Sequence, residues 1–138
     1  MDIDARGPRF AAALTTLVLA VALVTGSAWL LAWQTLAFAL GAAGGVGRSP
    51  YAWVFRTAVR PRIGPPTEFE SPQPPRFAQA VGLAFAALGL VGFTLGPDWL
   101  GLAATGAALA AAFLNAAFGY CLGCEMYLLA RRVTVRAE

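Results

Sequence analysis

The sequence contains no histidine and no lysine, and it has only two cysteines and seven acidic residues in 138. Without histidine, the chain by itself cannot form a Ser-His-Asp triad, a Cys-His pair or a histidine-ligated metal site. Charged residues make up 12% of the chain, against about 25% in soluble domains, and hydrophobic residues make up 59%. These shortages exclude most hydrolase chemistry and argue against an ordinary cytosolic enzyme.

Two long apolar tracts run from Phe10 to Gly47 and from Phe77 to Glu125, and a single charge, Asp98, interrupts them. One helix needs about 20 apolar residues to cross a bilayer, and each tract is about twice that long. Each tract therefore predicts a helical hairpin. Together they predict an all-α fold, an integral membrane four-helix bundle built of two tandem helical hairpins.

Small, polar and helix-breaking residues divide both tracts. Thr-Gly-Ser at 25–27 predicts the first turn, and Gly-Pro-Asp at 96–98 predicts the second. The four helices expected around these turns cover residues 10–24, 28–46, 77–95 and 99–118. With four spans, both termini lie on the same side of the membrane.

A secretory signal peptide is the alternative for the first tract, because Arg6 and Arg9 precede it and small residues follow at 26–28. Asp2 and Asp4 oppose the basic leader of such a peptide, and apolar sequence resumes directly after residue 28. We therefore expect the N-terminal segment to stay attached.

All ten basic residues are arginines, and none lies within an expected span. They flank the spans on one side only: Arg6, Arg9, Arg48, Arg56, Arg60, Arg62, Arg76, Arg131, Arg132 and Arg136. The positive-inside rule makes that side cytoplasmic, with both termini there. The positions of the arginines therefore indicate a multi-pass plasma-membrane protein. Its net charge of +3 is explained by contact with the lipid bilayer, and nucleic acid is not expected as a partner.

The segment between the hairpins is too polar to cross a membrane and has two parts. Ser49-Pro50 is a typical helix start, and the aromatic and arginine residues up to Arg60 suit a short helix at the inner membrane interface. Six prolines in residues 61–75 predict an extended, semi-rigid cytoplasmic strap. We thus expect a single membrane domain over 1–138, with hairpin repeats over 8–60 and 75–132 on either side of the strap.

An internal repeat underlies this division, because Pro-Arg-Phe-Ala at 8–11 recurs at 75–78, an offset of 67 residues. The same offset places Cys121 and Cys124 opposite the expected interfacial helix. Gly119 is then expected to mark a bend where the fourth span ends and a short helix begins. Cysteines in the first turn of that helix meet unpaired backbone N–H groups, which together with the helix dipole stabilise a thiolate.

Cys121 and Cys124 form a CxxC pair within Gly-Tyr-Cys-Leu-Gly-Cys-Glu at 119–125. In such a pair one thiolate attacks a substrate and the second resolves the mixed disulfide. Gly123 is expected to keep the sulfurs accessible, and the arginines that follow favour the thiolate. The alternatives are a metal site completed by Glu125 or by a second chain in a homodimer, and simple packing of two small apolar residues.

Three further residues are candidates for substrate binding. Arg9 and Arg76 are equivalent in the repeat and are expected near the inner interface, where they attract an anionic substrate or simply anchor the spans. Asn115 lies about a turn and a half before Cys121. We expect no cofactor, and no metal site within one chain.

Four segments give the chain a family resemblance: residues 4–10, 60–62, 75–79 and 119–125. In them it resembles the bacterial, mainly actinobacterial, membrane proteins grouped as domain of unknown function 4395, whose most specific motif is Gly-Tyr-Cys-x-Gly-Cys-Glu. The resemblance implies a four-span protein of the bacterial plasma membrane with Cys121 and Cys124 as functional residues. It also implies thioredoxin-like or sulfurtransferase proteins as partners, and it supplies no established activity.

We therefore expect Cys121 and Cys124 to act at the cytoplasmic face in thiol–disulfide exchange or in persulfide transfer. Cys121 is the expected attacking thiolate and Cys124 the resolving one. Two other functions stay open: a small sulfur-compound permease, and a structural membrane subunit with a metal-binding or incidental CxxC. Whether the protein is an enzyme is left open as well.

Overall fold

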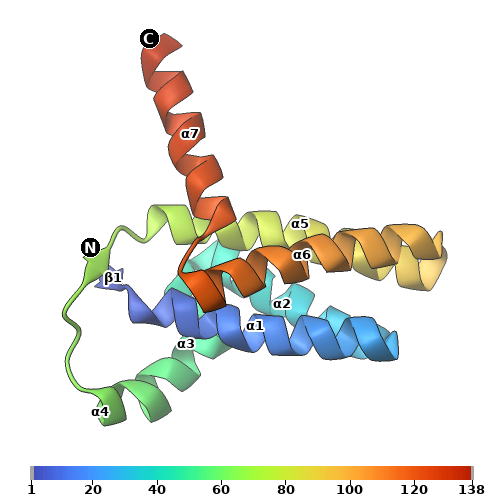
Figure 1. Ribbon diagram of the computed structural model, residues 1–138, viewed down its shortest axis with the longest axis horizontal. Coiled ribbons are helices and arrows are strands. Elements are labelled where there is room, and N and C mark those ends of the chain that lie inside the picture. The colour runs from blue at the N-terminus through green and yellow to red at the C-terminus, as the bar shows by residue number, and fades with distance from the viewer. Residues whose placement is uncertain (1, 138) are drawn as a thin grey trace.

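The computed structural model describes residues 2–137, and most of them are helical (Figure 1). The long helices are α1 (Arg6–Thr25), α2 (Ala28–Gly44), α5 (Gln73–Leu95), α6 (Asp98–Phe118) and α7 (Leu122–Ala137). Shorter pieces join α2 to α5: a 3₁₀ turn (Val46–Arg48), α3 (Pro50–Val54), a π-helical turn (Phe55–Val59) and α4 (Arg60–Ile63). The all-α prediction is confirmed. Met1 and Glu138, the ends of the predicted domain, lie outside the described residues.

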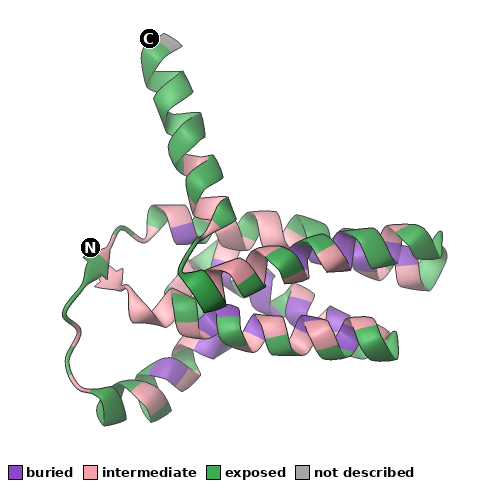
Figure 2. Cartoon of the chain, in the orientation of Figure 1, coloured by how far each residue is buried: buried purple, intermediate pink, exposed green. Residues whose placement is uncertain are grey.

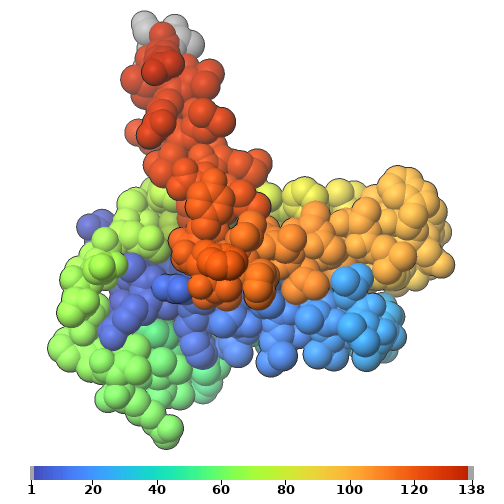
Figure 3. All heavy atoms as spheres, in the orientation of Figure 1, coloured from blue at the N-terminus to red at the C-terminus, as the bar shows by residue number. Residues whose placement is uncertain are grey.

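Helices α1, α2, α5 and α6 run along the long axis of the molecule (Figure 1). They pack in a closed ring, in which α1 contacts α2, α2 contacts α5, α5 contacts α6 and α6 contacts α1. Helix α7 leaves this group at a steep angle and stands clear of it beyond its base, exposed along most of its length (Figures 2 and 3). Its base packs on α5, where the rings of Phe77 and Tyr127 lie 5.7 Å apart.

The turn and cap residues predicted from the sequence join the helices as expected. Gly26 and Ser27 separate α1 from α2, and the Ser27 hydroxyl accepts a hydrogen bond from the backbone N–H of Leu30 (3.3 Å). The Gly-Pro pair at 96–97 separates α5 from α6. Ser49 caps α3 in the same way as Ser27 caps α2. Local sequence thus determines most of the helix boundaries.

The strap between the hairpins is shorter than predicted, and its predicted bounds of 61–75 were wrong at both ends. Helix α4 continues to Ile63 and α5 begins at Gln73, so extended chain covers only 64–72. The prolines at 74 and 75 lie in the first turn of α5, where a missing N–H costs no helical hydrogen bond. Within the strap, β2 (Phe69–Glu70) pairs antiparallel with β1 (Ile3–Asp4), a contact that no sequence pattern indicated.

Many of the residues between the helices are small or polar, and many large apolar side chains face outward. The residues that are at most 1% exposed are Leu19, Ala22, Leu31, Gln34, Ala37, Ala86 and Thr105. By contrast, Val24, Trp29 and Leu95 are 86%, 88% and 83% exposed. A soluble protein buries such large apolar side chains, whereas in a bilayer small residues mediate helix contacts and large ones meet lipid.

Within residues 2–137, three helices are long and apolar enough to cross a bilayer: α1, α5 and α6. Helix α2 is a shorter apolar helix of 17 residues. These lengths, together with the outward-facing apolar side chains, are compatible with a multi-pass membrane protein.

A buried polar cluster fixes α3 against the long helices. The Gln34 amide donates a hydrogen bond to the Thr15 hydroxyl (3.3 Å) and accepts one from the Tyr51 hydroxyl (2.6 Å). The Tyr51 hydroxyl also accepts a hydrogen bond from the Trp33 indole N–H (3.0 Å). Hydrogen bonds in such low-dielectric surroundings are strong, so the segment after α2 is held firmly in place.

Candidate functional site

The candidate site begins where α6 ends, at Gly119. This glycine has a φ of +69°, a backbone conformation that residues with a side chain rarely adopt, and it turns the chain away from α6. The N–H groups of Gly119 and Tyr120 donate hydrogen bonds to the carbonyls of Asn115 and Leu114 (2.9 and 3.2 Å). The predicted bend is therefore confirmed, and α7 follows from Leu122.

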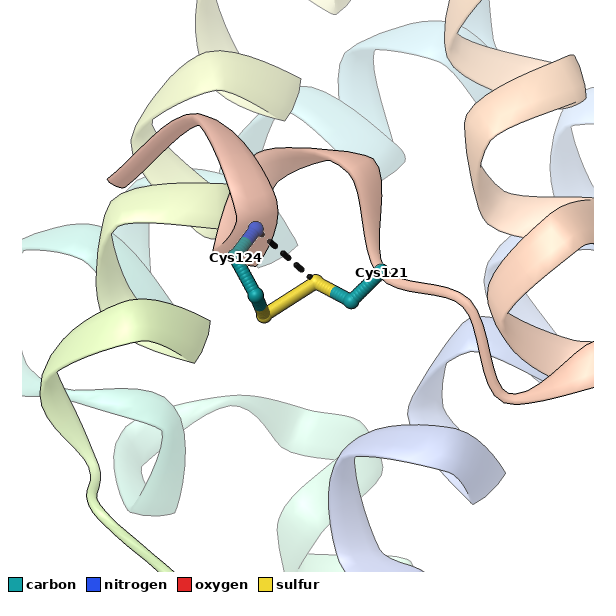
Figure 4. Close-up of a disulfide and its surroundings, with 2 residues drawn as sticks. All are labelled: Cys121 and Cys124. Atoms are coloured by element: carbon teal, nitrogen blue, oxygen red, sulfur yellow. Dashed lines mark hydrogen bonds between the residues drawn. A yellow bond between two sulfur atoms is a disulfide. The ribbon is translucent and has the colours of Figure 1, made fainter. Parts of the chain in front are cut away.

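Cys121 and Cys124 lie at the start of α7 and form a disulfide, with Cα atoms 5.2 Å apart (Figure 4). The Cys121 carbonyl accepts the first hydrogen bond of α7, from the N–H of Glu125 (3.0 Å), so Cys121 is the N-cap residue. Its sulfur accepts a hydrogen bond from the backbone N–H of Cys124 (3.1 Å). In the reduced state, that N–H and the positive end of the helix dipole both favour a thiolate at Cys121.

Gly123, which was predicted to keep the sulfurs accessible, also allows a close contact between two helices. A Cβ atom at this position would lie 2.6 Å from both the Cα and the Cβ of Ala78 on α5. The missing side chain therefore allows the first turn of α7 to touch the backbone of α5. This contact holds the CxxC turn against the long helices.

Arg9 of α1 caps the same end of α6. Its Nε and Nη2 atoms donate hydrogen bonds to the carbonyls of Ala116 and Ala117, both at 3.2 Å. These bonds satisfy carbonyls that the helix itself leaves unpaired, and a cation there stabilises the negative end of the α6 dipole. Arg9 therefore lies beside the turn that leads into the cysteines.

Arg76 of α5 makes the matching contact at the end of α2. Its Nε and Nη2 atoms donate to the carbonyls of Ala42 and Ala43 (2.8 and 2.7 Å). Each arginine thus belongs to the first helix of one hairpin and caps the second helix of the other hairpin. We call the site at the end of α2 the serine corner; it consists of Arg76, Gly45 and Ser49. We call the site at the end of α6 the cysteine corner; it consists of Arg9, Gly119 and Cys121.

The two corners correct the predicted register of the repeat. Helices α5 and α6 have 23 and 21 residues, against 20 and 17 for α1 and α2, so the second hairpin has seven more helical residues. The offset of 67 that relates Arg9 to Arg76 therefore does not hold beyond the hairpin turns. Cys121 corresponds to Ser49, the cap of α3, and not to a residue inside the interfacial segment.

A cavity of about 500 Å³ opens beside the disulfide. Its lining brings together four of the five residues predicted for the site: Cys121, Cys124, Arg9 and Asn115. The fifth, Arg76, is not among the described residues that line this cavity and lies at the serine corner. The two arginines that the sequence makes equivalent are therefore in different surroundings.

Glu70 also lines the cavity, although no sequence motif pointed to it. The pairing of β2 with β1 holds this residue near the N-terminal end of α1. Burial raises the pKa of the Glu70 carboxyl above its ordinary value of 4.5. A strand of two residues has no periodicity to recognise, so the sequence gave no signal for this placement.

Across residues 2–137, no three His, Cys, Asp or Glu side chains are grouped so as to hold a metal ion. Two thiolates make up half of the ligand set of a tetrahedral zinc site. The chemistry that Cys121 and Cys124 offer by themselves is the making and breaking of their disulfide.

Comparison with known proteins gives one match. The sequence model of the protein family described as Domain of unknown function (DUF4395) matches residues 3–132. No curated protein and no solved structure matches the chain. The matched residues include both hairpins, both corners and the CxxC pair.

Proposed function

The chain belongs to the family described as domain of unknown function 4395, and we propose that its Cys121–Cys124 pair carries out thiol–disulfide exchange at the cytoplasmic face of a membrane. One observation supports this most directly: the disulfide lies at the N-cap of α7 and lines a cavity together with Arg9. A cysteine at a helix N-terminus, near a cation and open to a cavity, is in the environment of a reactive thiol, whereas an inert cysteine is sealed in apolar surroundings.

In this proposal α2 is the fourth span of a membrane four-helix bundle. A helix of 17 residues is about 26 Å long, close to the ~30 Å of the hydrocarbon core. The arginines then lie at one end of the bundle, which the positive-inside rule assigns to the cytoplasm. The disulfide and both termini belong to that end, at the inner surface of a bacterial plasma membrane.

Cys121 is the proposed attacking group. Its sulfur accepts a hydrogen bond from the backbone N–H of Cys124 and lies at the positive end of the α7 dipole, and both features stabilise a thiolate. The Cys121 thiolate attacks one sulfur of a partner disulfide, forms a mixed disulfide and releases the partner's other sulfur as a thiolate. The Cys124 thiolate then attacks the Cys121 sulfur, closes the intramolecular disulfide and releases the second partner thiolate. Two electrons thereby pass from the cysteine pair to the partner.

The proposed partner is a cytoplasmic thioredoxin-like or sulfurtransferase protein. A sulfurtransferase would deliver a sulfane sulfur, which the Cys121 thiolate accepts as a persulfide. Attack by Cys124 on the inner sulfur of that persulfide then releases hydrosulfide and leaves the disulfide. Arg9 lies beside the pair and would attract an anionic sulfur donor.

The alkylation rate of each cysteine against pH tests the proposal, measured on the reduced protein in inside-out membrane vesicles. In Cys124→Ser we expect Cys121 to label with an apparent pKa below the free value of ~8.5, with or without a chelator. The same variant should trap a partner as a mixed disulfide, and its matched control Cys121→Ser should trap none. Slow labelling at every pH, or equal trapping by the two variants, would contradict the proposal. Labelling that speeds up with chelator would indicate a metal site instead.

A further inference from the structure

The cavity beside the disulfide is elongated along the bundle. On α6 its lining extends from Asn115 to Ala107, a distance of eight helical steps or about 12 Å. Its inner wall includes Phe38 and Ala108, which are both 7% exposed and belong to the main hydrophobic core. The cavity therefore reaches from the cysteine corner into the interior of the helix ring.

Alanines create this space. Four alanines of α6 line the cavity at positions 107, 108, 111 and 112, and their short side chains leave room between α6, α1 and α5. A volume of about 500 Å³ falls within the ~300–1,000 Å³ of typical small-molecule sites. The space is therefore large enough to hold a small molecule.

The two ends of the cavity differ in polarity. The end at the cysteine corner has the disulfide, Arg9, Asn115 and Glu70, while Phe38, Phe85 and alanines predominate in the rest, which also includes Thr15 and Gln79. Arg9 uses two of its five N–H donors on the end of α6, so donors remain for a ligand oxygen. A ligand that matches this lining has a polar head group next to the cysteine sulfurs and an apolar body between the helices.

We propose that this cavity binds a membrane-soluble quinone, which accepts the electrons of the reduced Cys121–Cys124 pair. The proposal rests on the proposed function. A phospholipid chain would fill the apolar part but cannot accept electrons, and a small water-soluble disulfide would leave the apolar part empty. A quinone with an apolar tail meets both requirements, and Arg9 and Asn115 of the lining offer hydrogen-bond donors for its ring oxygens.

The reaction balances without a further reagent. One cysteine thiolate adds to a ring carbon of the quinone, which forms a carbon–sulfur bond and moves an electron pair onto a ring oxygen. The second thiolate attacks the bonded sulfur, so that the disulfide forms, the carbon–sulfur bond breaks and its electron pair stays on the ring. The protons that the two thiols lost to water on ionising are replaced by two protons from water, one on each ring oxygen, as the quinol leaves. The quinone gains two electrons and the cysteine pair loses them.

Quinone reduction by the full chain in lipid nanodiscs tests the proposal. Reduced protein, freed of excess reductant and kept without oxygen, is mixed with a decyl-substituted benzoquinone, and the quinone absorbance is followed. We expect one quinol per chain and none from the Cys121→Ser/Cys124→Ser variant. Ala111→Leu fills the cavity and should slow the reaction about tenfold or more. Its matched control Ala110→Leu, on an exposed position of α6 outside the cavity lining, should react like the original protein.

A second readout separates this proposal from the proposed function. Oxidation of the reduced pair by a small soluble disulfide should proceed equally in Ala111→Leu and Ala110→Leu. If that exchange is normal but no quinone is reduced, or if both leucine variants reduce quinone alike, the quinone proposal is wrong and the thiol function stands. If the cysteines exchange with no disulfide at all, the proposed function itself fails. Phospholipid that co-purifies with the protein and resists displacement by quinone would also overturn the quinone proposal.

Discussion

The serine corner and the cysteine corner are built alike and differ at the capping residue. In each, an arginine from the other hairpin caps a helix, a glycine with positive φ turns the chain, and a side chain caps the next helix. Ser49 is 4% exposed, and its hydroxyl is engaged by the N–H of Tyr51. Cys121 is half-buried and lines a cavity. A corner of this kind therefore forms without sulfur, and the residue at its cap position decides whether the corner carries an attacking thiol.

The substitution with the largest expected effect gives both corners a serine at the cap position. Cys121→Ser should abolish disulfide exchange, because the attacking sulfur is gone. It should change the unfolding free energy of the reduced protein by less than about 1 kcal/mol, since serine is a favoured N-cap residue. Exchange with a chromogenic disulfide and thermal unfolding in detergent measure the two effects. Residual exchange in this variant would show that Cys124 reacts on its own.

The next largest effect concerns the contact that holds α7 against α5. Gly123→Ala places a Cβ atom 2.6 Å from the Ala78 backbone, so the helices must separate, at a cost of about 1–3 kcal/mol. The matched control is Gly106→Ala on α6, where nothing lies within 4 Å, and it should stabilise the protein by about 0.5–1 kcal/mol. Thermal unfolding compares the variants. Equal stabilities would mean that α7 does not dock on α5 as described.

Substitutions of Arg9 and Arg76 should lower the stability of the protein equally but should change the thiol pKa of the cysteines unequally. Arg9→Met and Arg76→Met each remove two hydrogen bonds to helix-end carbonyls, which should cost roughly 1 kcal/mol. Only Arg9→Met removes a cation from the cavity of the cysteines, so only this variant should raise the thiol pKa. Alkylation rates against pH measure the difference. A similar rise in both variants would show that the two corners are electrostatically alike.

The smallest expected effect is the pH dependence contributed by Glu70. Because burial raises the pKa of Glu70, the folded protein holds this proton more tightly than the unfolded chain does. The free energy of unfolding should therefore decrease as pH rises from 4.5 through the raised pKa. Glu70→Gln should remove this decrease, and Glu68→Gln, a second carboxyl at the same cavity, is the control. An unchanged profile in Glu70→Gln would show that Glu70 does not titrate in this range.

Local signals in the sequence predicted the boundaries of the fold well. Gly26 and Ser27, Ser49 with Pro50, and Gly119 each act within a few residues of themselves, through a turn or a helix cap. The placement of Cys121 and Cys124 at the start of a helix after a bend was predicted from the repeat offset of 67, although that offset does not hold at the cysteines. The sequence also predicted the pair, Arg9 and Asn115 as site residues, and these four residues line one cavity.

Features that depend on docking between distant segments were not predicted. The pairing of Ile3–Asp4 with Phe69–Glu70 joins strands too short to show alternation. Arg9 and Arg76 were expected at the membrane interface, but nothing in the sequence indicated that each caps a helix of the opposite hairpin. The repeat register failed because the second hairpin is longer, and a constant offset cannot follow a change in helix length.

The exchange of arginines between the hairpins has a consequence for the order of assembly during synthesis. A nascent chain that has made only the first hairpin lacks Arg76, the side chain that covers the end carbonyls of α2, and Arg9 has no α6 to cap. Neither hairpin has all of its helix ends capped until the other hairpin has been made. The cysteines follow α6 in the chain, so they reach their place last, after both halves have joined.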